Sequence, residues 1–216
     1  MRRRGLLAAV VLIGAACVCR CSTTPSEQPW TDTAPTACEA PVTATQTDVD
    51  PKDSPEKPWR REGDAKVRVV FETHALSDRY RQMVTRAADI WSASPCIAAV
   101  AADRCAEGDN CVRVVEQKAD GRSTDGEFKG KDGKKYRHGG KITLYTALLD
   151  RNTDQGALAT VVHEMGHALG LVHRLDTASV MNSHTDQHTN PIPDATDFAN
   201  LAVIYGREGP AQSALA

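Results

Sequence analysis

The chain has 216 residues, of which 41% are hydrophobic and 25% are charged, and its formal net charge is −2. This length gives room for one domain of ordinary size plus appendages. A chain without an excess of positive charge does not attract phosphate backbones, which argues against nucleic acid as a partner.

The first 21 residues have the pattern of an export signal. A basic start, Met1-Arg-Arg-Arg4, precedes an apolar run over residues 6–19 that is shorter than the roughly 20 residues a membrane-spanning helix needs. Residues 14–17 are similar to a lipobox, in which the cysteine becomes the lipidated first residue of the mature chain. Because Gly14 stands where a lipobox usually has leucine, and Cys19 and Cys21 compete with Cys17, lipid anchoring and free secretion both remain open. We expect an exported protein that meets a membrane only through such an anchor.

Residues 22–63 are rich in Pro, Thr, Ser, Asp and Glu. This composition is typical of a linker or pro-segment that buries too little apolar surface to fold alone. We therefore expect the folded domain at residues 64–208, followed by a short tail at residues 209–216.

The first half of this domain is predicted to contain strands and one helix. Residues 66–72 and 111–116 are rich in β-branched side chains and predict two strands. Between them, residues 77–94 carry apolar side chains at helical spacing behind a capping residue, Ser77. Residues 121–140 predict a hairpin that turns at residues 131–134, and residues 141–146 predict another strand.

Two helices follow. Residues 152–169 combine an expected N-cap at Asn152 with an apolar stripe, which consists of Leu158, Val161, Val162, Met165 and Leu169. Residues 197–205 predict a last helix that closes the domain. These elements predict a mixed α/β domain of the α+β class, in which two long helices pack on a twisted, mostly parallel sheet.

Four cysteines lie beyond the export signal: Cys38, Cys96, Cys105 and Cys111. An even number of cysteines in an oxidising compartment favours two disulfides, for which three pairings exist. The short loop from Cys105 to Cys111 is the easiest to close, which would leave Cys38 to pair with Cys96.

The segment from residue 163 to residue 173 matches HExxHxxGxxH at every fixed position. Residues four apart share one face of a helix, so His163 and His167 can aim both imidazoles at one ion. Gly170 tolerates the positive φ that ends a helix cheaply, and the turn there can bring His173 to the same ion. Three histidines leave a tetrahedral zinc with one open position, which is the arrangement of a catalytic site.

Glu164 follows the first histidine but points elsewhere on the helix. Its carboxylate can therefore reach a water at the open position rather than the metal itself. We expect Glu164 to act as the general base that takes the proton of this water and passes it to the leaving amine.

These residues resemble the metzincin clan of zinc endopeptidases. Within that clan, they are most similar to the matrixins and to the small secreted bacterial members. The clan also has a methionine in a tight turn beneath the metal, and Met181 is the natural candidate in this chain. The resemblance implies one catalytic zinc, a zinc helix at the cleft, an irregular C-terminal subdomain with a final helix, and protein or peptide substrates. Substrate is expected to bind extended along an edge strand, either residues 111–117 or the hairpin at 126–138.

The chain departs from relatives at two places. Some metzincins have a tyrosine two residues after the turn methionine, where this chain has Ser183, so no such helper is expected. Matrixins hold latent zinc with a cysteine in a PRCGxPD motif, of which Cys38 shares only its position three residues before a proline. A disulfide is the favoured role of Cys38, and a latency switch is the alternative.

Other functions remain as alternatives to an active endopeptidase. A surface binding protein could keep the metzincin fold without turnover, although it would not need Glu164, and a zinc amidase of non-peptide substrates would use the same motif. A structural calcium at Asp125, Asp132 and Asp150 lacks a supporting spacing, so turn chemistry is the better interpretation. We expect the protein to act as a monomer.

Overall fold

The computed structural model describes residues 35–63, 65–119 and 121–208. The export signal expected at residues 1–21, the start of the predicted linker and the tail at residues 209–216 lie outside these ranges. Within them, no helix is both long and apolar enough to cross a bilayer.

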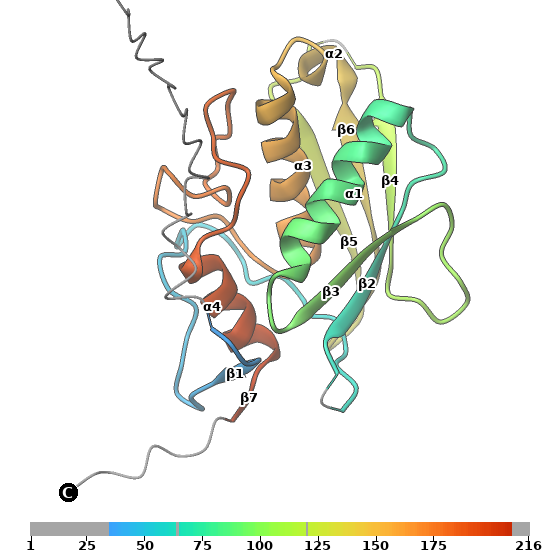
Figure 1. Ribbon diagram of the computed structural model, residues 1–216. Coiled ribbons are helices and arrows are strands. Elements are labelled where there is room, and N and C mark those ends of the chain that lie inside the picture. Colours follow the sequence, from blue (N-terminus) through green and yellow to red (C-terminus); the bar gives the residue numbers. More distant parts are fainter. Residues whose placement is uncertain (1–34, 64, 120, 209–216) are drawn as a thin grey trace, which may run out of the picture.

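A five-stranded sheet forms the body of the protein, with the strand order β3-β2-β4-β6-β5 (Figure 1). Four strands run parallel, and β5 alone is antiparallel to its neighbour β6. The strands are β2 (Val67–Glu72), β3 (Ile97–Ala102), β4 (Cys111–Gln117), β5 (Gly126–Asp132) and β6 (Arg137–Tyr145). The predicted mostly parallel sheet is confirmed, and β5 is the edge strand that the sequence left undecided.

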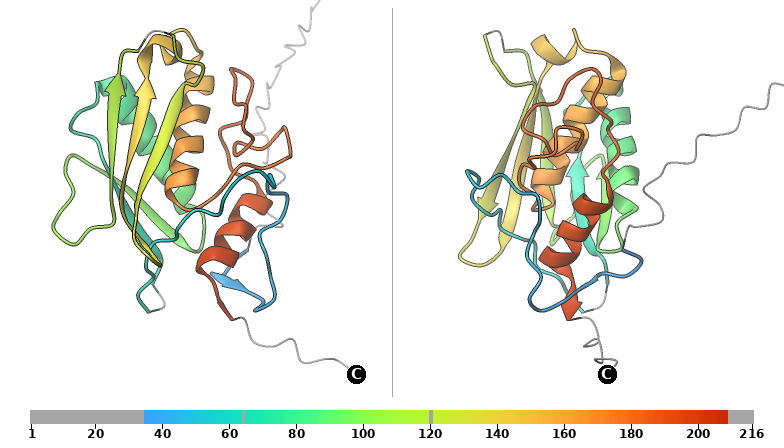
Figure 2. Two further views of the ribbon diagram at one scale, coloured as in Figure 1. Left: turned by 180° about the vertical axis from the view of Figure 1, so that it is seen from behind. Right: turned by 90° about the vertical axis from the view of Figure 1, so that its left-hand side faces the viewer.

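Two long helices, α1 (Asp78–Ser92) and α3 (Asp154–Ala168), cover the same face of the sheet (Figure 2). The apolar face of α1 is buried at Tyr80, Met83, Val84, Ala87 and Trp91. Trp91 also joins the two helices, because its Nε1 donates to the carbonyl of Val162 at 3.0 Å. The predicted pair of packed helices is confirmed, and their contact forms the centre of the core.

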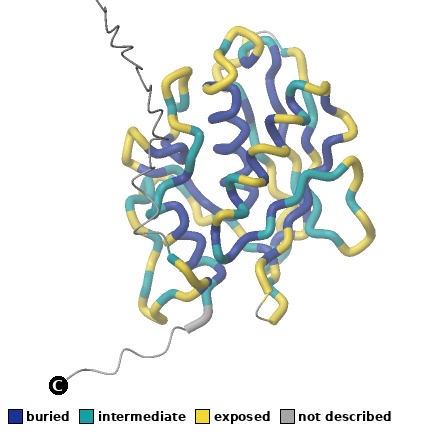
Figure 3. The backbone as a smooth tube through the Cα atoms, in the orientation of Figure 1, coloured by how far each residue is buried: buried dark blue, intermediate teal, exposed yellow. Residues whose placement is uncertain are grey.

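Helix α3 is buried along almost its whole length (Figure 3). The side chain of Thr153 caps it by accepting a hydrogen bond from the backbone N–H of Gly156 at 3.1 Å. The expected N-cap, Asn152, was therefore wrong by one residue, because the chain turns into the helix only after Thr153. Such a buried, well-capped helix is a rigid support for the side chains it carries.

Three short elements and one full strand were not predicted. The missed strand is β3, whose Ala-rich sequence Ile-Ala-Ala-Val-Ala-Ala carries little strand propensity but pairs with β2 along its whole length. The missed short elements are β1 (Glu39–Ala40), α2 (Thr146–Leu149) and β7 (Arg207–Glu208). The strands among them form by pairing with distant segments rather than by local preference, whereas α2 is a single helical turn.

The chain after α3 has no long regular element until the final helix α4 (Ala195–Tyr205). Asp194 and Asp197 form a capping box at its start, in which each side chain accepts from the backbone N–H of the other residue. The predicted irregular C-terminal part with a closing helix is confirmed.

Residues 35–63, which we call the N-terminal strap, differ from the expected linker because they pack against the domain (Figure 2). Trp59 is 1% exposed, and its Nε1 donates to the carbonyl of Ala168 at 2.8 Å. Strand β1 of the strap pairs with β7, and Cys38 forms a disulfide with Cys96. These few contacts hold the strap against the domain, although its average composition is typical of a disordered segment. An average over the segment cannot show which single residues make such contacts.

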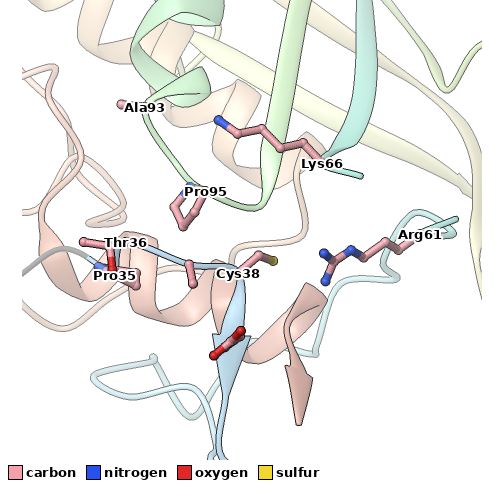
Figure 4. A pocket seen from close by; sticks show the side chains of 9 residues that line it. Pro35, Thr36, Cys38, Arg61, Lys66, Ala93 and Pro95 are labelled. Carbon is pink, nitrogen blue, oxygen red and sulfur yellow. The ribbon is translucent and has the colours of Figure 1, made fainter. Parts of the chain in front are cut away.

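Residues 35–208 contain two disulfides, Cys38–Cys96 and Cys105–Cys111. This confirms the predicted pairing, in which Cys105 and Cys111 close a short loop and Cys38 is left to pair with Cys96. A hollow of about 750 Å³ lies beside Cys38 (Figure 4), and the two cations that line it bind backbone carbonyls. Lys66 donates to Ser92 at 2.9 Å, and Arg61 donates to Tyr205 at 2.6 Å. The bond from Arg61 ties the strap to the end of α4.

Replacing Cys38 and Cys96 by serine is expected to lower the free energy of unfolding by about 2–4 kcal/mol. The lost cross-link spans 58 residues, so the unfolded chain gains much conformational freedom. Urea unfolding of the oxidised proteins checks this. The matched control is Cys105→Ser with Cys111→Ser, which opens a loop of only 6 residues and should cost less. An equal or larger loss of unfolding free energy in the control would contradict the greater stabilisation expected from the Cys38–Cys96 disulfide.

Candidate metal centre

Helix α3 places His163 and His167 on one face. They lie four residues apart, and their Nε2 atoms are 3.0 Å apart. Their rings are nearly perpendicular, with centroids 4.6 Å apart. Burial lowers the pKa of both imidazoles, to about 4 for His167 and well below the ordinary value for His163. Both side chains are therefore neutral at physiological pH and can offer a lone pair.

A tight turn at the end of α3 brings the third histidine to the first two. Gly170 has a φ of 104°. The backbone N–H of Leu171 donates to Gly166, and that of Gly170 donates to His167, each at 3.0 Å. This pair of bonds is a Schellman motif, which requires a residue with positive φ after the helix. The chain then returns so that Nε2 of His173 lies 3.3 Å from Nε2 of His167.

Each imidazole donates from its other ring nitrogen, Nδ1, to an oxygen that can only accept. Nδ1 of His163 donates to the carbonyl of Val180 at 2.7 Å, and Nδ1 of His167 donates to that of Leu171 at 2.9 Å. Nδ1 of His173 lies 2.8 Å from the carboxylate of Asp53. With every Nδ1 protonated, the three neutral rings point bare Nε2 lone pairs at one another.

This arrangement fits a cation. Lone pairs at 3.0–3.3 Å repel one another unless a positive ion lies between them. Nitrogen ligands of a tetrahedral zinc lie about 3.3 Å apart, given Zn–N bonds of about 2.0–2.1 Å. The described residues hold one other group with metal-ligand atoms, Glu72, Cys105 and Cys111, but its two sulfurs are joined in a disulfide. The histidine triad is therefore the group that could bind a metal.

Glu164 is 6% exposed and faces the edge strand β5. Its carboxylate accepts a hydrogen bond from the backbone N–H of Phe128, and burial raises its pKa to about 8. A Cβ built on Gly126 would lie 2.8 Å from Cγ of Glu164, so only glycine leaves room for this side chain. Gly126 was not among the predicted site residues, although an isolated glycine in a strand often marks such a close approach.

Met181 lies beneath α3. A Cβ built on Gly166 would lie 2.4 Å from Sδ of Met181, so this glycine allows the methionine to pack directly against the helix. The turn that carries Met181 is closed by the backbone N–H of Asn182, which donates to Ser179 at 3.0 Å. Because the preceding residue, Val180, accepts from His163, this turn also orients an imidazole.

Arg174 is a buried residue that the sequence analysis missed. Its side chain is 4% exposed, and its Nη1 donates to Asp194 at 2.7 Å and to Asp197 at 3.0 Å. Its Nε donates to Asp48 of the strap at 2.9 Å. Arg174 thus joins the chain after His173 to α4 and to the strap, but nothing in its local sequence indicates these distant partners.

A hollow of about 520 Å³ runs along the triad, lined by the three histidines, Glu164, residues of β5 and strap residues that include Asp53 and Glu56. Ser183 also lines it, whereas His184 and His188 are exposed and do not. Two of the acidic residues considered for calcium have cationic partners, since Asp132 pairs with Arg137 and Asp150 with Arg79.

Comparison with known proteins agrees with this geometry. The family model described as Matrixin matches residues 58–206, well over half of the chain. No curated protein is a match. Among solved structures, that of myroilysin matches with 17% identity and a TM-score of 0.42, covering 66% of this chain and 93% of that one. The mixed sheet, the histidine triad and the family match together identify the chain as a matrixin, a member of a metzincin-like family of zinc metalloproteases.

Proposed function

We propose that the protein is a zinc-dependent endopeptidase that hydrolyses peptide bonds of extracellular proteins or peptides. His163, His167 and His173 would hold a single zinc through Nε2, and Glu164 would be the general base. The observation that carries this proposal is the convergence of three bare Nε2 atoms in one hollow that also contains the Glu164 carboxylate.

Bound zinc would supply a Lewis acid that polarises the scissile carbonyl and lowers the pKa of a water from ~15.7 to about 7. The protein's own part is proton transfer by Glu164. A cation beside the carboxylate favours its charged form, which opposes the effect of burial on its pKa. Glu164 can then take a proton from the attacking water and return it to the leaving amine, while the N–H of Phe128 holds its carboxylate in place.

The substrate would lie along β5. This strand pairs only with β6 among the described residues, and Gly126, Glu127 and Phe128 at its start line the hollow beside Glu164. An extended peptide could therefore add to the outer edge of β5 through main-chain hydrogen bonds. Such binding holds a peptide by its backbone, which favours protein and peptide substrates over small amides.

Export is part of the proposal. Two disulfides are consistent with an oxidising compartment. We propose that the mature protein is secreted or held at the cell surface by an N-terminal lipid, and that it acts as a monomer.

Removing the metal tests the function. We expect the purified full chain to contain one zinc and to cleave casein or gelatin. Cleavage should fall to background when a chelator removes the zinc and should return when one equivalent is added back, because the chemistry depends on the ion. Metal analysis and a cleavage assay measure both. Cleavage that survives complete zinc removal would contradict the proposal.

The same assay separates the alternatives. A chain that binds zinc at the triad but cleaves neither casein nor peptides would be a non-catalytic binding protein. A chain that hydrolyses only small non-peptide amides would be an amidase.

A further inference from the structure

The third imidazole of the triad differs from the other two in its partner. His163 and His167 donate to neutral backbone carbonyls, whereas Nδ1 of His173 faces the carboxylate of Asp53 at 2.8 Å. The same carboxylate oxygen accepts from the backbone N–H of His173 at 2.8 Å. Asp53 thus holds both the ring and the main chain of this residue.

His173 is also the member of the triad that lies outside helix α3. It follows the end of α3 on an irregular segment, and its side chain is 29% exposed, whereas His163 is buried within the helix. A carboxylate on Nδ1 fixes the tautomer and orientation of an imidazole and makes Nε2 a stronger donor to a metal. The ligand that the helix does not hold is therefore the one whose ring faces a carboxylate.

The strap is built so that Asp53 stays in place. Its backbone pairs with His173 and with the chain just after it: the N–H of Asp50 donates to the carbonyl of His173 at 2.8 Å, and the N–H of Leu175 donates to the carbonyl of Asp48 at 2.9 Å. Arg174 adds its ion pair with Asp48. Further along the strap, Glu56 pairs with the fully buried guanidinium of Arg137.

We propose that Asp53 is a positioning residue for His173, and that the strap is a retained part of the metal site rather than a pro-segment that is discarded on activation. This inference rests on the proposed zinc function and adds to it a contact outside the HExxHxxGxxH segment. It places one support of the site 120 residues away in the sequence.

The test is zinc affinity. In the full-length protein, Asp53→Asn is expected to weaken zinc binding about 10–100-fold, as removal of such outer supports of metal ligands typically does. Asparagine keeps the shape and can still accept from the backbone N–H, so the change removes mainly the charge. Asp53→Glu restores a carboxylate and should recover part of the affinity. Competition with a chelating dye gives the dissociation constants.

Asp50→Asn is the matched control. Asp50 lies in the same turn of the strap, and its carboxylate accepts only from the backbone N–H of Lys52 among the described contacts of its side chain. It should bind zinc within about twofold of wild type, since that carboxylate has no part in orienting a ligand. Two readouts exclude a merely structural effect: urea unfolding of the metal-free proteins should be the same for both variants, and the visible spectrum of the Co²⁺-substituted protein should change only in Asp53→Asn.

The outcomes are distinct. If Asp53→Asn binds zinc as tightly as wild type, the role of Asp53 is overturned, whereas failure of the wild type to bind zinc would overturn the proposed function itself. Mass spectrometry of the active enzyme, after its disulfides have been reduced, tests whether the strap is retained. An active form that lacks residue 53 would overturn the inference, and one that begins before Cys38 would support it.

Discussion

Glu164→Gln is expected to lower kcat/KM for peptide hydrolysis by about 10²–10⁴-fold, the range that general acid–base catalysis contributes. Glutamine has the shape of glutamate and can still accept from the N–H of Phe128, but it cannot take a proton from water. The three histidines keep their partners, so the variant should still bind one zinc with wild-type affinity. Steady-state kinetics on a fluorogenic peptide and metal analysis measure the two effects separately.

Glu127→Gln is a suitable comparison because Glu127 lines the same hollow. Its carboxylate is already held by the hydroxyl of Tyr145 at 2.9 Å and by Lys129 at 2.9 Å, which leaves it a poor base. We expect this variant to lose less than about tenfold in kcat/KM, because no proton transfer depends on it. If the two variants lost the same activity, the loss would come from removing a negative charge near the site, and the role of Glu164 as general base would be contradicted.

The convergence of the three histidines could be predicted from the sequence because its determinants are local. His163 and His167 share a face of one helix, and Gly170 supplies the turn that returns His173, so eleven consecutive residues specify the triad. The helices and strands with strong periodicity were also predicted. By contrast, β3 consists mostly of alanine, which has little strand preference, and only its pairing with β2 makes it a strand.

The supports of the metal centre could not be predicted, because they depend on contacts between distant residues. Asp53 reaches His173 across 120 residues, and Asp48 reaches Arg174 across 126. A window of sequence around residue 50 contains mostly prolines and polar residues, which is the pattern of a linker. Such contacts exist only after the sheet and α4 have placed the partners together.

Arg174→Met is expected to lower the free energy of unfolding by about 3–5 kcal/mol, the usual cost of removing one partner from a buried ion pair. The loss arises mainly from Asp197, which is 0% exposed and would keep a buried charge without its cationic partner. Methionine fills a similar volume, so a cavity is not the main effect. Urea unfolding of the metal-free proteins measures the loss without a contribution from zinc binding.

Arg113→Met is the matched control, since the side chain of Arg113 is 73% exposed and lies 3.7 Å from Glu72. The guanidinium of Arg113 is mostly solvated, and Glu72 still accepts from the backbone N–H of Cys105 at 3.1 Å, so this variant should remain within about 0.5 kcal/mol of wild type. Adding Asp197→Asn to Arg174→Met should recover part of the lost stability, because the stranded charge is removed. No recovery would mean that the loss comes from packing instead.

The pH dependence provides an independent check on Asp197. Burial raises the pKa of Asp197 to about 6 in the folded protein, above the value of about 3.9 for an unfolded aspartate. The folded state therefore binds the proton more tightly, and the resulting stability is present at low pH and lost as the pH rises through about 6. Without Arg174 the pKa of Asp197 in the folded state must rise further, so Arg174→Met gains more than wild type on acidification. We expect the difference in unfolding free energy between the two proteins to be smaller near pH 5 than near pH 8, and a difference that stays constant would show that Asp197 does not carry the uncompensated charge.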